Sequence, residues 1–222
     1  LILIVFTFQA SILFTGTFGM SVRSQALEYE VGNLTLFTFG GDYGLFTHIQ
    51  QYLYLYIPLL TMGLMSRELS SGSIKLLYSS PVTNKEIVLG KYFAMLVYGL
   101  VLIGILAIYV LYSACTIKAF DFTVVLSGLL GLYLLICAYA SIGLFMSSLT
   151  SYQVVSAMGT LAILAALSLV RGMWQDIEFV REITYWLSIN GRVDEFVNGL
   201  ICSEDILYFL IVITLFLTLT IL

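Results

Sequence analysis

Charge is scarce in this chain. Of its 222 residues only 10% are charged, 9 of them Lys or Arg and 13 Asp or Glu. A soluble domain usually carries about 25% charged residues, which cover its water-facing surface. Hydrophobic residues instead make up 60% of the chain, and the mean hydropathy is +1.04. These values exclude a soluble globular enzyme.

The few charges are also unevenly placed. Five stretches contain no Asp, Glu, Lys or Arg at all: 1–22, 43–66, 92–117, 122–170 and 206–222. A helix needs about 20 apolar residues to cross the hydrocarbon core, whereas the strands of a membrane barrel are short and alternate. The fourth stretch is long enough for two spans and a turn. We therefore predict an all-α integral membrane protein, a single domain over 1–222 with six transmembrane helices at about 1–20, 44–65, 92–114, 122–146, 154–170 and 206–222.

Other absences exclude catalytic and metal sites. The three cysteines, Cys115, Cys137 and Cys202, are too few and too dispersed for a disulfide framework or a zinc site. No GxxxxGK[ST] phosphate-binding loop occurs, and the only histidine, His48, has no carboxylate within one helical turn. No basic cluster points to nucleic acid, and no predicted span carries a charge at its middle, as ion-coupled transporters usually do. The sequence thus predicts no catalytic residue and no metal.

The charges that remain indicate the orientation in the membrane. Six spans alternate the loops between two faces, with 66–91 and 147–153 on one and 22–43, 115–121 and 171–205 on the other. The first, shorter set contains Arg67, Lys75, Lys85 and Lys91, so its density of basic residues is higher. Loops rich in Lys and Arg stay in the cytosol. The segment 66–91 is therefore predicted to be cytosolic.

Segment 66–91 contains signals for two breaks between helices. Gly72 can end a helical extension of the second span, and Ser73 can cap a new short helix over 74–79. Pro81 stops that helix, because the residue before a proline is pushed out of the helical region. The pattern predicts a short amphipathic helix lying between two long ones.

A third helix start follows at Thr83, with Glu86 three residues later in the arrangement of a capping box. Between the breaks, Leu76, Leu77 and Tyr78 form an apolar group in a cytosolic segment. Such a group indicates a docking element that fits a groove on another protein. An interfacial helix lying on the lipid headgroups explains the same pattern equally well.

The loop 171–205 has two apolar faces at helical spacing. Their members are Ile177, Val180, Ile183, Trp186 and Leu187, and then Val193, Phe196, Val197, Leu200 and Ile201. Asn190-Gly191 is predicted to form the turn between them. Two such helices either dip back into the membrane as an outer gate or rest at the interface, with Trp186 as a belt residue.

The chain resembles the permease subunit of an ABC-2 type transporter. The residues that carry the resemblance are Pro58–Met62, Glu68, Ser71–Leu77, Ser80–Val82 and Glu86–Lys91. The stretches Leu187–Phe196, Gly199–Ile201 and Asp205–Phe209 are similar to the last loop and final span of the branch with gliding-motility and nitrous-oxide-reductase-maturation permeases. Two positions depart from the family, which often has paired acidic residues at Arg67-Glu68 and threonine at Ser73.

The resemblance implies a site on each face of the membrane. The coupling region, which would sit in a groove of a cytosolic ATPase, would comprise Glu68, Gly72, Ser73, Ile74, Leu76 and Leu77. The outer gate would be a re-entrant helical hairpin containing Trp186, Phe196 and Leu200. The family also has an amphipathic helix before its first span, which would precede Leu1.

It also implies the partners: a dimer of ABC ATPases, a second permease copy or a homologous permease, and membrane lipid. ATP and Mg²⁺ would bind the ATPase, and this chain would hold no cofactor. The location would be the plasma membrane of a prokaryote, the inner membrane in a Gram-negative cell. An ATP-independent facilitator or a scaffold subunit of a membrane assembly is the alternative, and the substrate is left open.

Overall fold

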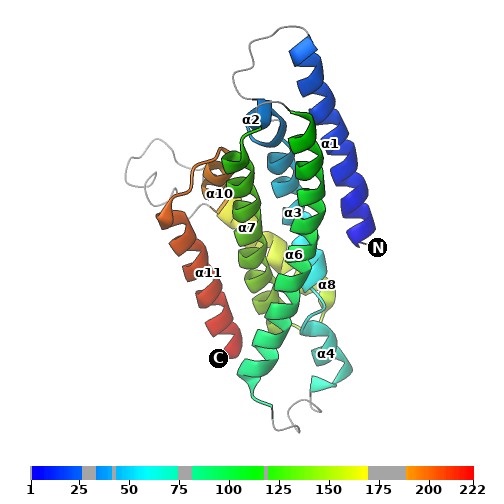
Figure 1. The fold of residues 1–222 in the computed structure, drawn as a ribbon. Helices are drawn as coiled ribbons and strands as arrows, with labels where there is room; N and C mark the ends of the chain where they lie inside the picture. Colours follow the sequence, from blue (N-terminus) through cyan, green and yellow to red (C-terminus); the bar gives the residue numbers. More distant parts are fainter. Residues whose placement is uncertain (1, 27–33, 42–43, 75–81, 118–119, 170–188) are drawn as a thin grey trace. The chain divides into compact units, whose positions relative to one another are not determined.

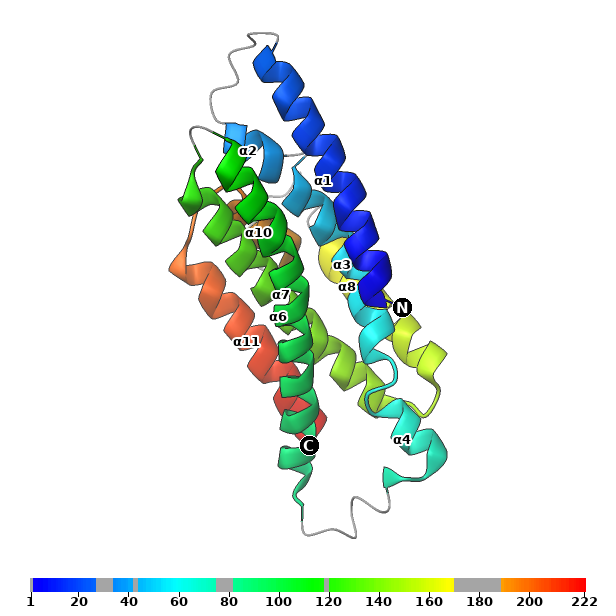
Figure 2. The same cartoon turned by 45° about the vertical axis from the view of Figure 1, so that its right-hand side comes forward.

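A computed structural model (Figure 1, Figure 2) describes residues 2–26, 34–41, 44–74, 82–117, 120–169 and 189–222, and every regular element in these ranges is a helix. An apolar run in lipid must satisfy its backbone N–H and C=O groups internally, which a helix does within one segment. The helices are α1 (Ile2–Ala26), α2 (Leu34–Phe39), α3 (Leu45–Thr61), α4 (Ser66–Ser71), α6 (Asn84–Thr116), α7 (Phe122–Leu149), α8 (Gln153–Leu169), α10 (Ile189–Val197) and α11 (Ser203–Ile221).

Four helices in the described ranges are long and apolar enough to cross a membrane: α1, α6, α7 and α11. Helices α3 and α8 coincide with the second and fifth predicted spans, but each has only 17 residues. The prediction of a helical membrane bundle is therefore supported, with four helices of spanning length where the sequence predicts six spans.

Helix α6 begins earlier than the span predicted over 92–114. It has 33 residues, and a rise of about 1.5 Å per residue makes it about 50 Å long, against a hydrocarbon core of about 30 Å. A helix of this length extends beyond the hydrocarbon, and we expect the charged first turns with Lys85 and Glu86 to lie outside it.

The chain divides into two compact units. Unit 1 comprises Leu1–Tyr52, Leu100–Tyr133 and Arg192–Cys202, and unit 2 comprises Leu53–Gly99, Leu134–Gly191 and Ser203–Leu222. Unit 1 contains the described parts of 22–43 and 115–121, two loops predicted to share a face. Unit 2 contains the described parts of 66–91 and all of 147–153, which are predicted to share the other face.

In unit 1, the start of α7 is attached to α2. The Asp121 backbone N–H donates to Thr35 Oγ1 at 3.1 Å, and Asp121 Oδ1 accepts the Thr123 N–H at 3.0 Å. Asp121 thus caps the first turn of α7, where helix N–H groups have no partner in the helix. The rings of Phe39 and Phe120 meet edge to face, with centroids 6.2 Å apart. Loop and helix are therefore fixed together at this end of the unit.

In unit 2, tyrosine hydroxyls link neighbouring helices. Tyr54 on α3 donates to the Leu161 carbonyl of α8 at 3.0 Å, and Tyr92 on α6 donates to the Cys137 carbonyl of α7 at 3.3 Å. Helix α4 and the first turns of α6 lie at the same end of this unit in both views (Figure 1, Figure 2). That end holds most of the predicted coupling residues that the structure describes.

Candidate functional site

The second predicted span and α4 are separated by a break. Helix α3 ends at Thr61, three residues after Pro58, and α4 begins at Ser66. The sequence predicts one helical extension as far as Gly72, and the structure corrects this with a turn over 62–65. A turn leaves backbone groups without helical partners, so side chains from elsewhere have to satisfy them.

Ser147, at the end of α7, supplies hydrogen-bond partners for backbone groups of this turn. Its Oγ accepts the N–H groups of Met65 at 2.9 Å and Ser66 at 3.1 Å, and donates to the Met62 carbonyl at 3.1 Å. Met65 itself makes no side-chain cap for α4. The fully buried Ser147 hydroxyl therefore caps α4 from another helix, and fixes α4 to α7.

Lys91 on α6 fixes the same turn from a second direction. Its Nζ donates to the Leu64 carbonyl and forms an ion pair with Glu68 Oε2 at 2.5 Å. Both side chains of the pair are partly buried, which reduces screening by solvent. The Glu68 carboxylate thus pairs with a cation of its own chain, and α4 is joined to α6.

Gly72 ends α4 as predicted. Its φ of 70° and ψ of 2° lie in the left-handed region, and its N–H donates to the Leu69 carbonyl at 3.3 Å. A residue with a Cβ pays about 1–2 kcal/mol in that conformation, and asparagine tolerates it best after glycine. Glycine at this position is therefore needed for the backbone geometry.

We expect Gly72→Ala to lower the free energy of unfolding by about 1–2 kcal/mol. No heavy atom lies within 4 Å of the position that a Cβ would take, so the loss would come from the backbone alone. Gly72→Asn is the control and should lose clearly less. Thermal unfolding of both variants in detergent measures the difference, and a Gly72→Ala variant as stable as the native protein would contradict the assignment.

The next predicted coupling residues are described only in part. Ser71 Oγ and Ser73 Oγ lie 2.8 Å apart and share a hydrogen bond. Ile74 has a helical conformation. Leu76 and Leu77, with the rest of the predicted coupling helix, lie outside the described residues.

The predicted capping box at the start of α6 is confirmed. The Thr83 N–H donates to Glu86 Oε2 at 2.9 Å, and the Glu86 N–H donates to Thr83 Oγ1 at 3.4 Å. The hydrogen bond from the Thr83 backbone N–H is the main reason that the pKa of the Glu86 carboxyl lies below its usual range. A hydrogen bond with the Thr83 side chain lowers this pKa further. This carboxylate also lies at the positive end of the α6 dipole, so the helix start is well defined.

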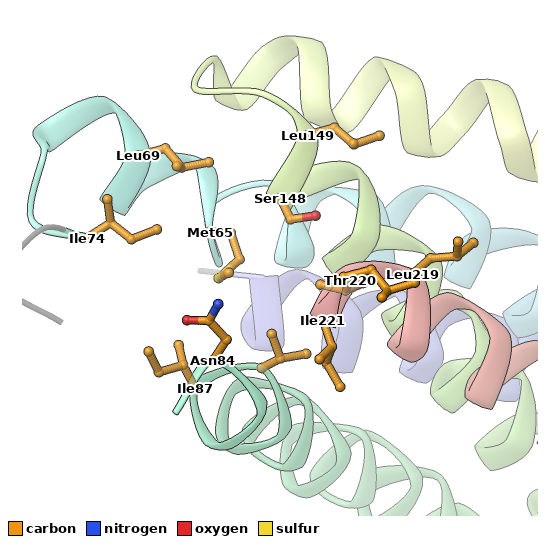
Figure 3. A pocket seen from close by; sticks show the side chains of 12 residues that line it. Met65, Leu69, Ile74, Asn84, Ile87, Ser148, Leu149, Leu219, Thr220 and Ile221 are labelled. Atoms are coloured by element: carbon orange, nitrogen blue, oxygen red, sulfur yellow. The ribbon is translucent and has the colours of Figure 1, made fainter. Parts of the chain in front are cut away.

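A pocket of about 280 Å³ lies beside the break. Figure 3 shows side chains around it from the α4 region (Met65, Leu69, Ile74), α6 (Asn84, Ile87), α7 (Ser148, Leu149) and α11 (Leu219, Thr220, Ile221). Most of these side chains are apolar. The predicted coupling residue Ile74 thus lines a cavity together with α6, α7 and α11.

On the other predicted face, α10 is packed into unit 1. Phe196 is 0% exposed, and a Cβ on Gly131 of α7 would lie only 2.5 Å from its Cβ. Ser127 Oγ donates to the Phe196 carbonyl at 2.8 Å, and Gln50 Nε2 donates to Asp194 Oδ1 at 3.4 Å. Phe196 is therefore an anchor of α10 against α7.

Two details of the predicted outer hairpin are wrong. Asn190 and Gly191 lie inside α10 and do not form a turn. The helix ends at Val197, and Gly199 has a φ of 91°, so Leu200 lies beyond the helix and is 61% exposed. Trp186 and the first half of the hairpin lie outside the described residues.

A sequence profile described as ABC-2 family transporter protein matches residues 1–222. The chain belongs to the ABC-2 transporter family. Its membership and its apolar helices make it a permease-type, multi-pass membrane component. Neither a curated protein nor a solved structure matches the chain.

Sequence reasoning about an ABC-2 permease does not find Ser147 and Lys91, which hold α4 in place. Ser147 contacts residues 81 and 82 positions away in the chain, so no local pattern marks it. Lys91 is a cation at the start of a span, a position that also suits ordinary interfacial anchoring. Lys91 also ends the stretch Glu86–Lys91 that carries the resemblance, but nothing in that stretch indicates a contact with α4.

Proposed function

We propose that this chain is the six-span permease subunit of an ATP-driven, exporter-like ABC-2 transporter in a prokaryotic plasma membrane. It would pair with a second permease and dock on a cytosolic ATPase dimer that binds ATP and Mg²⁺. The branch would be that of the gliding-motility and nitrous-oxide-reductase-maturation permeases. Family membership supports the class, since ABC-2 permeases generally work with an ABC ATPase.

The observation that carries the coupling proposal is the attachment of α4 to two long helices. Ser147 joins α4 to α7 by hydrogen bonds, and the Lys91–Glu68 ion pair joins it to α6. A force applied to α4 would then reach both helices through these contacts. ATP-driven closure of the ATPase dimer would supply that force.

The chain just after α4, with Ile74, could move toward the pocket beside the break. Its lining from α4, α6, α7 and α11 is mostly apolar, so Ile74 can enter it without leaving a polar group unpaired. On the outer face, Trp186, Phe196 and Leu200 would form the gate, with Phe196 as the fixed point and Leu200 as the exposed one. Rearrangement of α6 and α7 would open it.

The test replaces the predicted docking residues by aspartate in the triple variant Ile74→Asp, Leu76→Asp and Leu77→Asp. Burying unpaired carboxylates in an apolar groove is costly, and we expect at least about tenfold less ATPase to copurify. Tyr152→Asp is the matched control, because Tyr152 is exposed and lies on the same predicted face outside the coupling region.

Three results would contradict the proposal. Unchanged copurification together with ATP-coupled transport by the triple variant would contradict the coupling assignment. Substrate transport by the purified chain with no ATPase present would favour the ATP-independent facilitator. An equal loss in the Tyr152→Asp control would show that any added charge on this face is disruptive, and the coupling residues would lose their special role.

A further inference from the structure

An aromatic groove lies between α1 and α6 in unit 1, where the two helices run side by side (Figure 1, Figure 2). Its volume is about 480 Å³. Phe14 lies against Phe18 and Tyr109, with ring centroids 5.2 and 5.1 Å apart, and Tyr112 meets Phe18 edge to face at 5.9 Å. Tyr112 is 59% exposed, so the groove is open on the side that would face lipid.

Two polar side-chain atoms of the groove wall, Thr15 Oγ1 and the Tyr109 hydroxyl, are already engaged within the protein. Thr15 Oγ1 donates to the Ser11 carbonyl at 2.8 Å, and the Tyr109 hydroxyl donates to the Thr7 carbonyl at 3.3 Å. The wall therefore offers an occupant little beyond apolar and aromatic contact. An apolar occupant fits this part of the groove best.

A cation stands one helical turn beyond the groove. Arg23, in the last turn of α1, is four residues after the groove residue Gly19, so both lie on one face of the helix. A long helical side chain covers the turn before its own Cα, and no heavy atom lies within 4 Å of the Cβ position at Gly19. Arg23 is exposed and forms no ion pair with the described residues.

We propose that this groove seats an acyl chain of an anionic phospholipid, with the lipid phosphate on Arg23. The apolar groove and the cation beyond it match the order of chain and headgroup in a lipid leaflet. A helix of a second permease would also be apolar, but charge complementarity with the exposed Arg23 guanidinium favours an anionic lipid. The proposal concerns a bound lipid and does not depend on the transport function.

The test places a single tryptophan at the groove by Ile108→Trp, with Trp174→Phe and Trp186→Phe, in the full chain in nanodiscs. Ile108 lines the groove and is exposed. Brominated phosphatidylglycerol and brominated phosphatidylcholine with the same acyl chains quench a tryptophan that they touch. Both lipids carry a phosphate, but the choline cation neutralises that of phosphatidylcholine. One arginine near the surface should therefore give the anionic phosphatidylglycerol about a fivefold advantage in the mole fraction for half-quenching.

Three variants separate the charge from the groove. Arg23→Gln should abolish the preference and Arg23→Lys should keep most of it, while Gly19→Leu, which fills the groove, should weaken quenching by both lipids. Leu126→Trp, exposed on α7 and not part of the groove, is the control in place of Ile108→Trp and should show no preference. Circular dichroism and gel filtration verify that each variant is folded.

Equal quenching by the two lipids, a preference that survives Arg23→Gln, or the same preference at Leu126→Trp would each overturn the proposal. Quenching by neither lipid would also overturn it, because another protein segment would then cover the groove.

Discussion

Gly143→Ala is expected to lower the free energy of unfolding by about 1–3 kcal/mol, the usual cost of overpacking. A Cβ at Gly143 of α7 would lie 2.1 Å from Oγ1 and 2.6 Å from Cβ of Thr61, at the end of α3. Thr61 cannot move aside easily, because it is fully buried and its Oγ1 donates to the Ile57 carbonyl at 3.0 Å. Either the helices must separate or Thr61 must lose this contact.

Gly104→Ala on α6 is the matched control. No heavy atom lies within 4 Å of its Cβ position, and glycine to alanine inside a helix normally stabilises by about 1 kcal/mol. The two identical substitutions should therefore have opposite signs. Denaturant unfolding in detergent micelles, followed by circular dichroism, measures both. If Gly143→Ala gains stability as Gly104→Ala does, the close approach of α3 and α7 is wrong.

The positions of the six longer described helices were predictable from charge alone, but their ends were not. A segment in the hydrocarbon must be uncharged, so each uncharged run coincides with at least one helix. Hydropathy reports where the membrane ends, however, and a helix can continue into water. Helix α6 starts at Asn84 and not near 92, because Lys85, Glu86 and Lys91 are tolerated on a helix outside the hydrocarbon.

At the break between α4 and α6, the local signals were reliable. Gly72 and the Thr83–Glu86 capping box depend only on residues close by in the sequence, and both are confirmed. Asn190-Gly191 has the composition of a turn, but it lies in α10, where burial of Val193 and Phe196 outweighs the local preference. Tertiary packing overrides propensity in such cases.

Two charged residues of the loop 171–205 are buried, although its charged composition predicts a loop exposed to water. Arg192 and Asp205 are 2% and 3% exposed, whereas a polar loop at a membrane surface would place charges in water. Such burial depends on contacts between segments that are far apart in the sequence. The number of charges in a segment does not reveal these contacts. The same holds for Ser147, whose hydroxyl appears in the sequence as one of several in a polar turn.

Ser147→Ala is expected to destabilise unit 2 by about 1–3 kcal/mol, the cost of leaving buried donors without an acceptor. The Met65 and Ser66 N–H groups would lose their acceptor, and the Met62 carbonyl would keep only the hydrogen bond from Ser66 Oγ. Local protection should fall most at the start of α4. Hydrogen exchange of peptides covering residues 62–71, with unfolding in detergent, measures both effects.

Ser141→Ala is the matched control, because Ser141 is as fully buried on α7 but its Oγ donates only to the Ala138 carbonyl of its own helix, at 2.7 Å. It should change neither the exchange near α4 nor transport. In the proposed permease, Ser147→Ala should leave ATPase binding intact and lower transport per ATP hydrolysed several-fold, because α4 would then shift without α7. Equal behaviour of the two alanine variants would mean that Ser147 is only a packing residue, and that the coupling force reaches the bundle through Lys91 alone.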